Sequence, residues 1–66
     1  MKIVFNGQPR SVSPDTTVAA LLSELKLTAR HVAVEINLDI IPRERHASHL
    51  LRDGDSVEVV TLVGGG

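Results

Sequence analysis

Apolar and polar residues alternate at the start of the chain, with Met1, Ile3 and Phe5 on one face. This two-residue period is typical of a half-buried β-strand. Asn6-Gly7 follows, and the dipeptide favours a type I′ hairpin turn because both central residues need a positive φ. We therefore expect residues 8–12 to return antiparallel to the first strand. Pro9 has no N–H to donate, so the returning strand should lie at an edge of the sheet.

A helical period replaces the alternation after the turn-forming cluster at residues 13–16. Apolar residues then recur at i, i+3, i+4 and i+7, which are Val18, Leu21, Leu22 and Leu25. This spacing predicts an amphipathic helix over residues 17–26. Its single apolar stripe needs a cover, and a sheet can supply it.

Further strands follow the helix. Residues 31–36 alternate again, and residues 39–41 permit only a short extended piece before a proline. We expect residues 43–49 to form a loop with at most a single helical turn. Residues 56–63 are the longest β-branched run, and both of their faces are largely apolar. Such a strand is usually interior to its sheet, and we place it beside the first strand.

The predicted order is hairpin, helix, strand, short strand and long strand. It corresponds to an α+β fold, the ubiquitin-like β-grasp, in which one main helix packs on one face of a mixed four- to five-stranded sheet. We expect a β-grasp domain over residues 1–63 and a flexible glycine tail over residues 64–66. Modifiers, small sulfur carriers and interaction domains share this fold, so the fold alone does not decide the function.

Composition restricts the chemistry. A chain of 66 residues leaves little room for an internal substrate pocket, so we expect chemistry at an edge or an end. The absence of cysteine excludes a thiol nucleophile and thiolate metal ligands. The net charge is −1, no Lys/Arg run exists and Phe5 is the one aromatic residue, so we expect no nucleic-acid partner. No long apolar run predicts a membrane span, and we expect a cytoplasmic protein.

The sequence ends in Gly64-Gly65-Gly66. One interpretation is a frayed or engineered end. The functional one is a thin thread of about 10 Å that enters a partner's cleft and presents the carboxylate of Gly66. A carboxylate anion is a poor electrophile, so ATP-dependent adenylation would have to supply a leaving group before a sulfur nucleophile could attack. The chain shows no nucleophile–base pair at recognisable spacing, so partners would supply the catalysis.

Several segments together resemble the ThiS family, the sulfur carrier of thiamine biosynthesis, over nearly the whole chain. They are Phe5-Asn6-Gly7, Thr17-Val18-Ala19-Ala20-Leu21-Leu22, Val32-Ala33-Val34-Glu35-Ile36-Asn37, Ile41-Pro42-Arg43, Leu51-Arg52-Asp53-Gly54-Asp55-Ser56-Val57-Glu58-Val59-Val60 and Gly65-Gly66. The resemblance implies that Gly65 and Gly66 form the reactive tail. Gly64 is additional to the family's pair, and its effect on the reach of the tail stays open.

The same resemblance implies the partners. A ThiF-like adenylating enzyme, related to ubiquitin-activating enzymes, would act on Gly66. Sulfur would come from cysteine through a desulfurase, and a ThiG-like thiazole synthase would consume the thiocarboxylate. We expect the carrier itself to bind no cofactor, with ATP used by the adenylating partner.

A docking surface follows from the strand alternation. If the helix covers one face of the sheet, the opposite, open face should carry Val4, Ala33, Val60 and Leu62. Contiguous exposed apolar side chains often mark an interface. The alternative is that loops cover this face or that it is incidentally apolar.

Other polar residues receive structural interpretations. The histidines are His31, His46 and His49, and we expect them to be solvated rather than to bind a metal, because no thiolate or clear carboxylate completes a site. Residues 43–45 (Arg-Glu-Arg) should be solvated surface. Asp53 and Asp55 flank a glycine, which favours a turn over a pair of catalytic carboxylates.

Three other functions stay open. A sulfur carrier for molybdopterin synthesis would share the fold and the tail, although the short chain favours thiamine. A ubiquitin-like protein modifier would join Gly66 to lysines of target proteins. A β-grasp interaction domain would not need its terminus at all.

Overall fold

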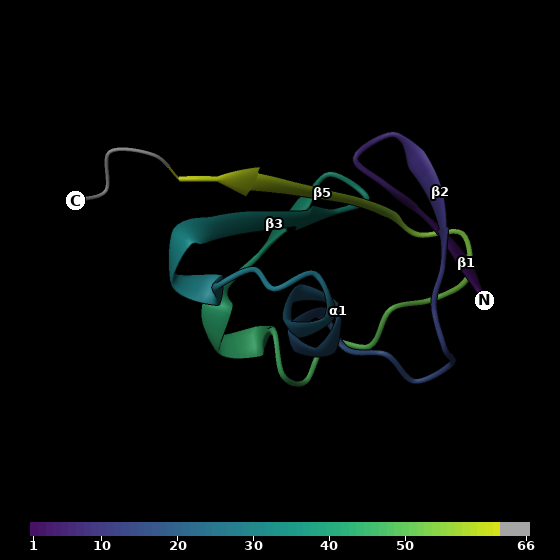
Figure 1. The fold of residues 1–66 in the computed structure, drawn as a ribbon, viewed down its shortest axis with the longest axis horizontal. Helices are drawn as coiled ribbons and strands as arrows, with labels where there is room; N and C mark the ends of the chain where they lie inside the picture. Colours follow the sequence, from purple (N-terminus) through teal and green to yellow (C-terminus); the bar gives the residue numbers. More distant parts are fainter. Residues whose placement is uncertain (63–66) are drawn as a thin grey trace.

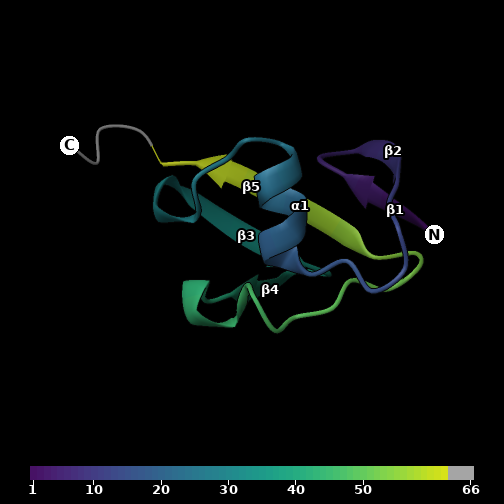
Figure 2. The same ribbon diagram turned by 60° about the horizontal axis from the view of Figure 1, so that its bottom comes forward.

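A computed structural model describes residues 1–62, in which five β-strands form one sheet and one α-helix crosses a face of it (Figure 1). The elements are β1 (Lys2–Phe5), β2 (Gln8–Ser11), α1 (Val18–Glu24), β3 (Val32–Ile36), β4 (Asp39–Ile41) and β5 (Ser56–Thr61), with 3₁₀ turns η1 (Ala29–His31) and η2 (Arg43–Arg45). Figure 2 shows the helix lying over β3 and β5. The predicted element order and the β-grasp fold are confirmed.

The strand order across the sheet is β2-β1-β5-β3-β4. Strands β1 and β5 run parallel, while the other neighbouring pairs are antiparallel, so the sheet is mixed. The prediction that the last strand is interior and lies beside the first is confirmed. Strand β2, with Pro9 opposite Val4, forms an edge as expected.

The first hairpin turn has the predicted geometry, with φ of +47° at Asn6 and +81° at Gly7. The turn between β3 and β4 is built in the same way from Asn37 and Leu38, whose φ values are +51° and +74°. Both turns therefore use the left-handed region that type I′ turns require. Only the first turn has glycine at its second position.

Helix α1 is shorter than the 17–26 predicted from the apolar spacing. Thr17 is its N-cap, and the Thr17 hydroxyl accepts a hydrogen bond from the N–H of Ala20 at 3.1 Å. Val18 and Ala19 lie between Thr17 and Ala20. The N–H of Val18 donates to the carbonyl oxygen of His49, and that of Ala19 donates to the carbonyl oxygen of His46. The loop after η2 thus supplies acceptors that the first helical turn cannot find within the helix.

The helix ends early because the chain turns left-handed at Lys26, where φ is +59°. The N–H of Lys26 donates to the carbonyl of Ser23, and that of Leu27 donates to the carbonyl of Leu22. These two bonds form a Schellman motif, which usually has glycine at the left-handed position. Leu25 therefore packs against the core from the C-cap rather than from within the helix.

The core lies between α1 and the sheet. Its fully buried side chains include Ile3, Val18, Leu21, Val34 and Val57, which come from the helix and from three strands. The faces predicted from alternation are therefore confirmed.

The expectation that all three histidines are solvated is wrong for His46, which is buried. Its Nε2 donates to the carbonyl oxygen of Ile41 at 3.0 Å, and its backbone carbonyl accepts from the N–H of Ala19. His31, by contrast, is exposed, and His49 is half-buried. A hydrogen bond between the loop and β4 thus determines the position of His46.

Candidate functional site

The end of β5 is the candidate site, because in the sequence only Leu62 and Val63 separate this strand from the three terminal glycines. Leu62 is the last described residue, and its N–H donates to the carbonyl oxygen of His31 at 2.7 Å. Strand β5 points away from the N-terminal end of the molecule (Figure 1). Residues 63–66, and with them Gly65 and Gly66 as the predicted sulfur-carrying pair, lie outside the described residues, so those assignments stay predictions.

Asn6 fixes the middle of β5 from the side opposite β3. Its Oδ1 accepts from the N–H of Val59 at 2.8 Å, and its Nδ2 donates to the carbonyl oxygen of Val59 at 3.2 Å. The N–H of Asn6 also donates to the carbonyl of Val57. One amide side chain therefore continues the pairing between β1 and β5 past the point where β1 ends.

The predicted docking residues lie on the open face of the sheet. Val4 is 40% exposed, Val60 is 59% and Leu62 is 52%, while Ala33 is half-buried. Ala33 and Val60 are direct cross-strand partners, whereas Val4 lies opposite Ser56, and Glu58 separates Ser56 from Val60 on this face. The placement of the predicted docking residues is confirmed, and their role in docking stays a prediction.

The open face also carries residues that the sequence reasoning did not include. Ile40 of β4 is 65% exposed and lies opposite Glu35. Glu35 lies opposite Glu58, which places two carboxylates side by side in the sheet. A shallow pocket of about 90 Å³ lies among Glu35, Ile40, Glu58 and Val60. Alternation could have assigned these residues to the face, but only the strand register shows that the carboxylates are neighbours.

The acidic turn before β5 has the structural role expected from its glycine. Asp55 is buried, and its carboxylate accepts from the N–H of Arg52 at 2.9 Å and from Nδ2 of Asn37 at 3.0 Å. Asp53 accepts from the N–H of Lys2 at 2.7 Å. Both carboxylates therefore serve as backbone or side-chain acceptors that hold the turn against the sheet.

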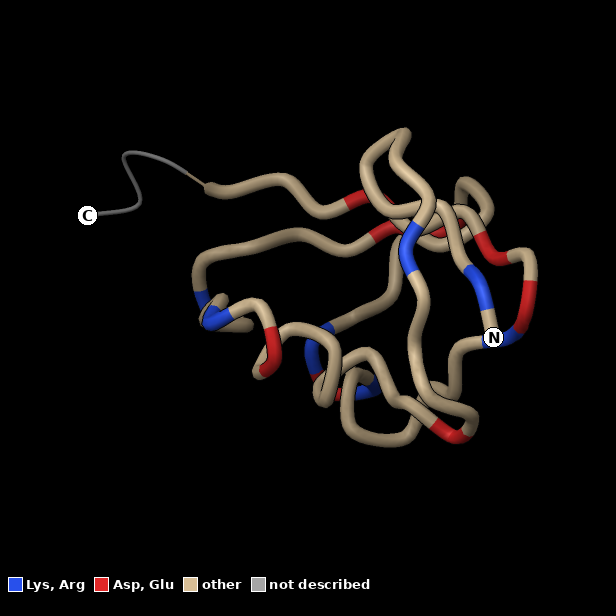
Figure 3. The backbone as a smooth tube through the Cα atoms, turned by 45° about the vertical axis from the view of Figure 1, so that its right-hand side comes forward, with Lys and Arg blue, Asp and Glu red and all other residues tan. Residues whose placement is uncertain are grey.

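Neither the distribution of charged residues nor the arrangement of possible metal ligands indicates a second site among residues 1–62. Basic and acidic positions are interspersed along the backbone (Figure 3). No group of three or more His, Asp or Glu side chains within residues 1–62 could hold a metal ion. The Arg-Glu-Arg segment of η2 is exposed, as expected. Among these residues, no helix has the length and hydropathy of a membrane span.

Comparisons with known proteins agree on one family. The family model described as "ThiS family" matches residues 3–66. The protein "Sulfur carrier protein ThiS" of Escherichia coli is 36% identical over 66 residues, which are all of both chains. A thiazole synthase of Paramagnetospirillum magneticum is 48% identical over 66 residues, and this chain spans 20% of that protein's length.

A solved structure extends this agreement to three dimensions. The crystal structure of a thiamine biosynthesis protein (ThiS) from Geobacter metallireducens superposes with a TM-score of 0.86 at 38% identity and covers all of both chains. The β-grasp assignment therefore rests on a related structure as well as on the observed topology.

Proposed function

Because the chain belongs to the ThiS family, we propose that it acts as a sulfur carrier of thiamine biosynthesis and that the carboxylate of Gly66 carries the sulfur. The protein is a sulfur carrier with a ubiquitin-like β-grasp fold. The carrying carboxylate is the finer part of the proposal. The observation that supports it is that β5, paired with β3 up to Thr61 and bonded to Asn6 at Val59, is followed in the sequence by Leu62, Val63 and then Gly64-Gly65-Gly66.

The chemistry requires activation of this carboxylate by another protein. Attack of the carboxylate on ATP would release pyrophosphate and leave an acyl-adenylate at Gly66. The outer sulfur of a persulfide on the sulfur donor would then displace AMP and form an acyl disulfide with that donor. A thiol of a partner protein would attack the donor's sulfur and break the S–S bond, which leaves a thiocarboxylate at Gly66 and a disulfide between the two partner thiols. The tail supports this role because three glycines have no Cβ and allow an enzyme to close tightly around the backbone.

Partners follow from this cycle. Thiazole synthase is the acceptor of the sulfur, a proposal supported by relatives in which a segment similar to this chain belongs to a thiazole synthase. A ThiF-like enzyme adenylates Gly66 and supplies the ATP site, and a cysteine desulfurase is the source of the sulfur. The cycle would take place in the cytoplasm.

The open face would be the surface that the adenylating enzyme recognises. Its apolar residues are the exposed Val4, Val60 and Leu62 and the half-buried Ala33. An apolar surface beside the exit of the tail would hold the carrier while Gly66 enters a separate catalytic site. In this arrangement, affinity comes from the sheet and reactivity from the tail.

The test is the intact mass of the protein recovered from its native host, compared with a variant that lacks Gly65 and Gly66. We expect a species heavier by the exchange of one oxygen for sulfur, present only with the intact tail. Fragmentation should place the added mass on Gly66. The proposal fails if only the unmodified mass is found after incubation with the adenylating enzyme, ATP and a sulfur donor.

A further inference from the structure

One edge of β5 has no partner strand near its end. Strand β3 accompanies β5 from Val57 to Thr61, but β1 pairs with it only at Ser56 and Val57 before the chain turns at Asn6. The side chain of Asn6 then occupies the backbone groups of Val59. Within the described residues, no strand continues on this side beyond Val59.

The backbone of Thr61 faces that vacant side. Backbone N–H and C=O groups of successive strand residues point to opposite neighbours. The N–H of Leu62 donates toward β3, while the groups of Val59 point toward β1. Thr61 has the same parity as Val59, so its N–H and C=O point to the side that β1 has left. Among residues 1–62, no backbone or side-chain group bonds to them there.

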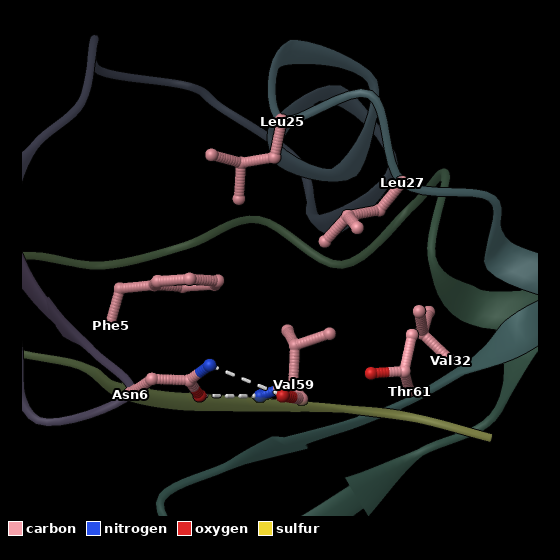
Figure 4. Close-up of a pocket in the computed structure, with 7 residues that line it drawn as sticks. All are labelled: Phe5, Asn6, Leu25, Leu27, Val32, Val59 and Thr61. Carbon is pink, nitrogen blue, oxygen red and sulfur yellow. Dashed lines mark hydrogen bonds between the residues drawn. The ribbon is translucent and has the colours of Figure 1, made fainter. Parts of the chain in front are cut away.

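A pocket of about 300 Å³ lies beside this edge, between the end of α1 and the sheet (Figure 4). Its walls are formed by five apolar residues, Phe5, Leu25, Leu27, Val32 and Val59, and by the polar residues Asn6 and Thr61. The side-chain amide of Asn6 is already bonded to Val59, as the dashed lines show. The pocket therefore offers contact to an apolar group and few free polar groups to a polar ligand.

The two features fit one occupant. A strand added beside Thr61 would place the side chain that lies opposite Thr61 on the helix-facing side of the sheet, because paired residues point to the same face. That side is where the pocket lies. An extended backbone carrying an aliphatic side chain would thus satisfy the free backbone groups and fill the pocket at once, which is the mode called β-augmentation.

We propose that the free edge of β5 and the adjoining pocket bind an extended segment of thiazole synthase, which adds a strand beside Thr61 and inserts an aliphatic side chain between Phe5 and Leu27. The proposal rests on the proposed function, since it concerns the protein that receives sulfur from the tail. Thiazole synthase is the chosen occupant because, in two relatives, a segment similar to this chain is part of a thiazole synthase. A strand paired at Thr61 would hold the last residue of β5 and so set the direction in which residues 63–66 leave the sheet.

Hydrogen exchange of the full-length protein with and without purified thiazole synthase tests the pairing. We expect the amide of Thr61 to exchange at least about tenfold more slowly in the complex. The amide of Leu62, already bonded to His31, serves as the internal reference and should change less. A complex that forms without protection of Thr61 would overturn the proposal, and so would a failure of thiazole synthase to bind.

Two variants test the edge and the pocket separately. Thr61→Pro removes the outward N–H while leaving the bonds to β3, and Val59→Phe fills the pocket without removing a backbone donor. Each should weaken binding of thiazole synthase in calorimetry by at least about tenfold, whereas Leu38→Phe, on a distant hairpin, should change it by less than about twofold.

Thermal unfolding establishes that each variant is folded. Val59→Phe adds bulk inside an existing pocket, so it keeps the test available if Thr61→Pro disturbs the strand. Wild-type affinity in folded Val59→Phe would overturn the proposal. The thiocarboxylate mass measurement is independent of this docking mode, so a failure here leaves the carrier function standing, and a missing thiocarboxylate would refute the function itself.

Discussion

Leu38 is a residue held in an unfavourable backbone conformation. Its φ is +74° and its side chain is 85% exposed, so no packing compensates for the left-handed geometry. Leu38→Gly should raise the free energy of unfolding by about 0.5–1 kcal/mol, after allowance for the greater freedom of glycine in the unfolded chain. Urea denaturation measures the change. Leu38→Ala is the matched control, because it removes the side chain and keeps the strain, and it should give no such gain. Equal stability of the two variants would contradict this explanation.

Asn6 combines a left-handed φ with two hydrogen bonds to Val59. Asn6→Gly keeps the backbone conformation accessible and removes only the bonds, so it should lower the free energy of unfolding by about 1–2 kcal/mol. Asn6→Asp retains the acceptor for the N–H of Val59, so its free energy of unfolding should lie between those of the wild type and Asn6→Gly. Chemical denaturation of the three proteins gives the order. Wild-type stability in Asn6→Gly would show that the side chain does not hold β5.

The cap of α1 allows a matched comparison at the scale of the element. Thr17 accepts a hydrogen bond from Ala20, whereas Thr28, at the equivalent position of η1, makes no side-chain capping bond. Thr17→Ala should therefore destabilise the fold by about 1 kcal/mol, and Thr28→Ala by much less. Thermal or urea unfolding distinguishes them. Equal losses would mean that the threonine side chains act through something other than capping.

The elements themselves could be predicted from local pattern, and their ends could not. Alternation located the strands, and the i, i+3, i+4, i+7 spacing located the helix. The helix end was missed because Lys26, not a glycine, takes the left-handed position of the Schellman motif. The burial of His46 was missed because it depends on contacts of a loop with β4 and α1 that no local pattern records.

At the scale of the whole molecule, the sequence predicted which apolar residues lie on the open face of the sheet. It did not predict which residues are neighbours across the strands. Alternation assigns Val4, Ala33, Val60 and Leu62 to one side of the sheet wherever the strands lie. The juxtaposition of Glu35 with Glu58 depends on strand register, and the free edge at Thr61 depends on how early β1 ends. Long-range pairing determines both, so they became visible only once the strand order was known.

The open face gives the last prediction, which separates docking from stability. Leu62→Lys introduces a charge at the edge of the apolar surface, at a side chain that is already 52% exposed. We expect unfolding to change by no more than about 0.5 kcal/mol, because surface substitutions are usually that small. The adenylating enzyme would have to desolvate the new ammonium group on docking, so kcat/KM for adenylation should fall by at least about tenfold.

Leu50→Lys is the matched control, because Leu50 is 50% exposed but lies opposite Thr17 at the start of α1, away from the open face. It should leave kcat/KM within about twofold of the wild-type value. Val60→Lys, at the centre of the proposed surface, should repeat the loss seen with Leu62→Lys. Since the three substitutions introduce the same charge, a loss confined to Val60 and Leu62 would assign the effect to the surface rather than to net charge. Wild-type kinetics in both open-face variants would exclude this face as the docking site for adenylation.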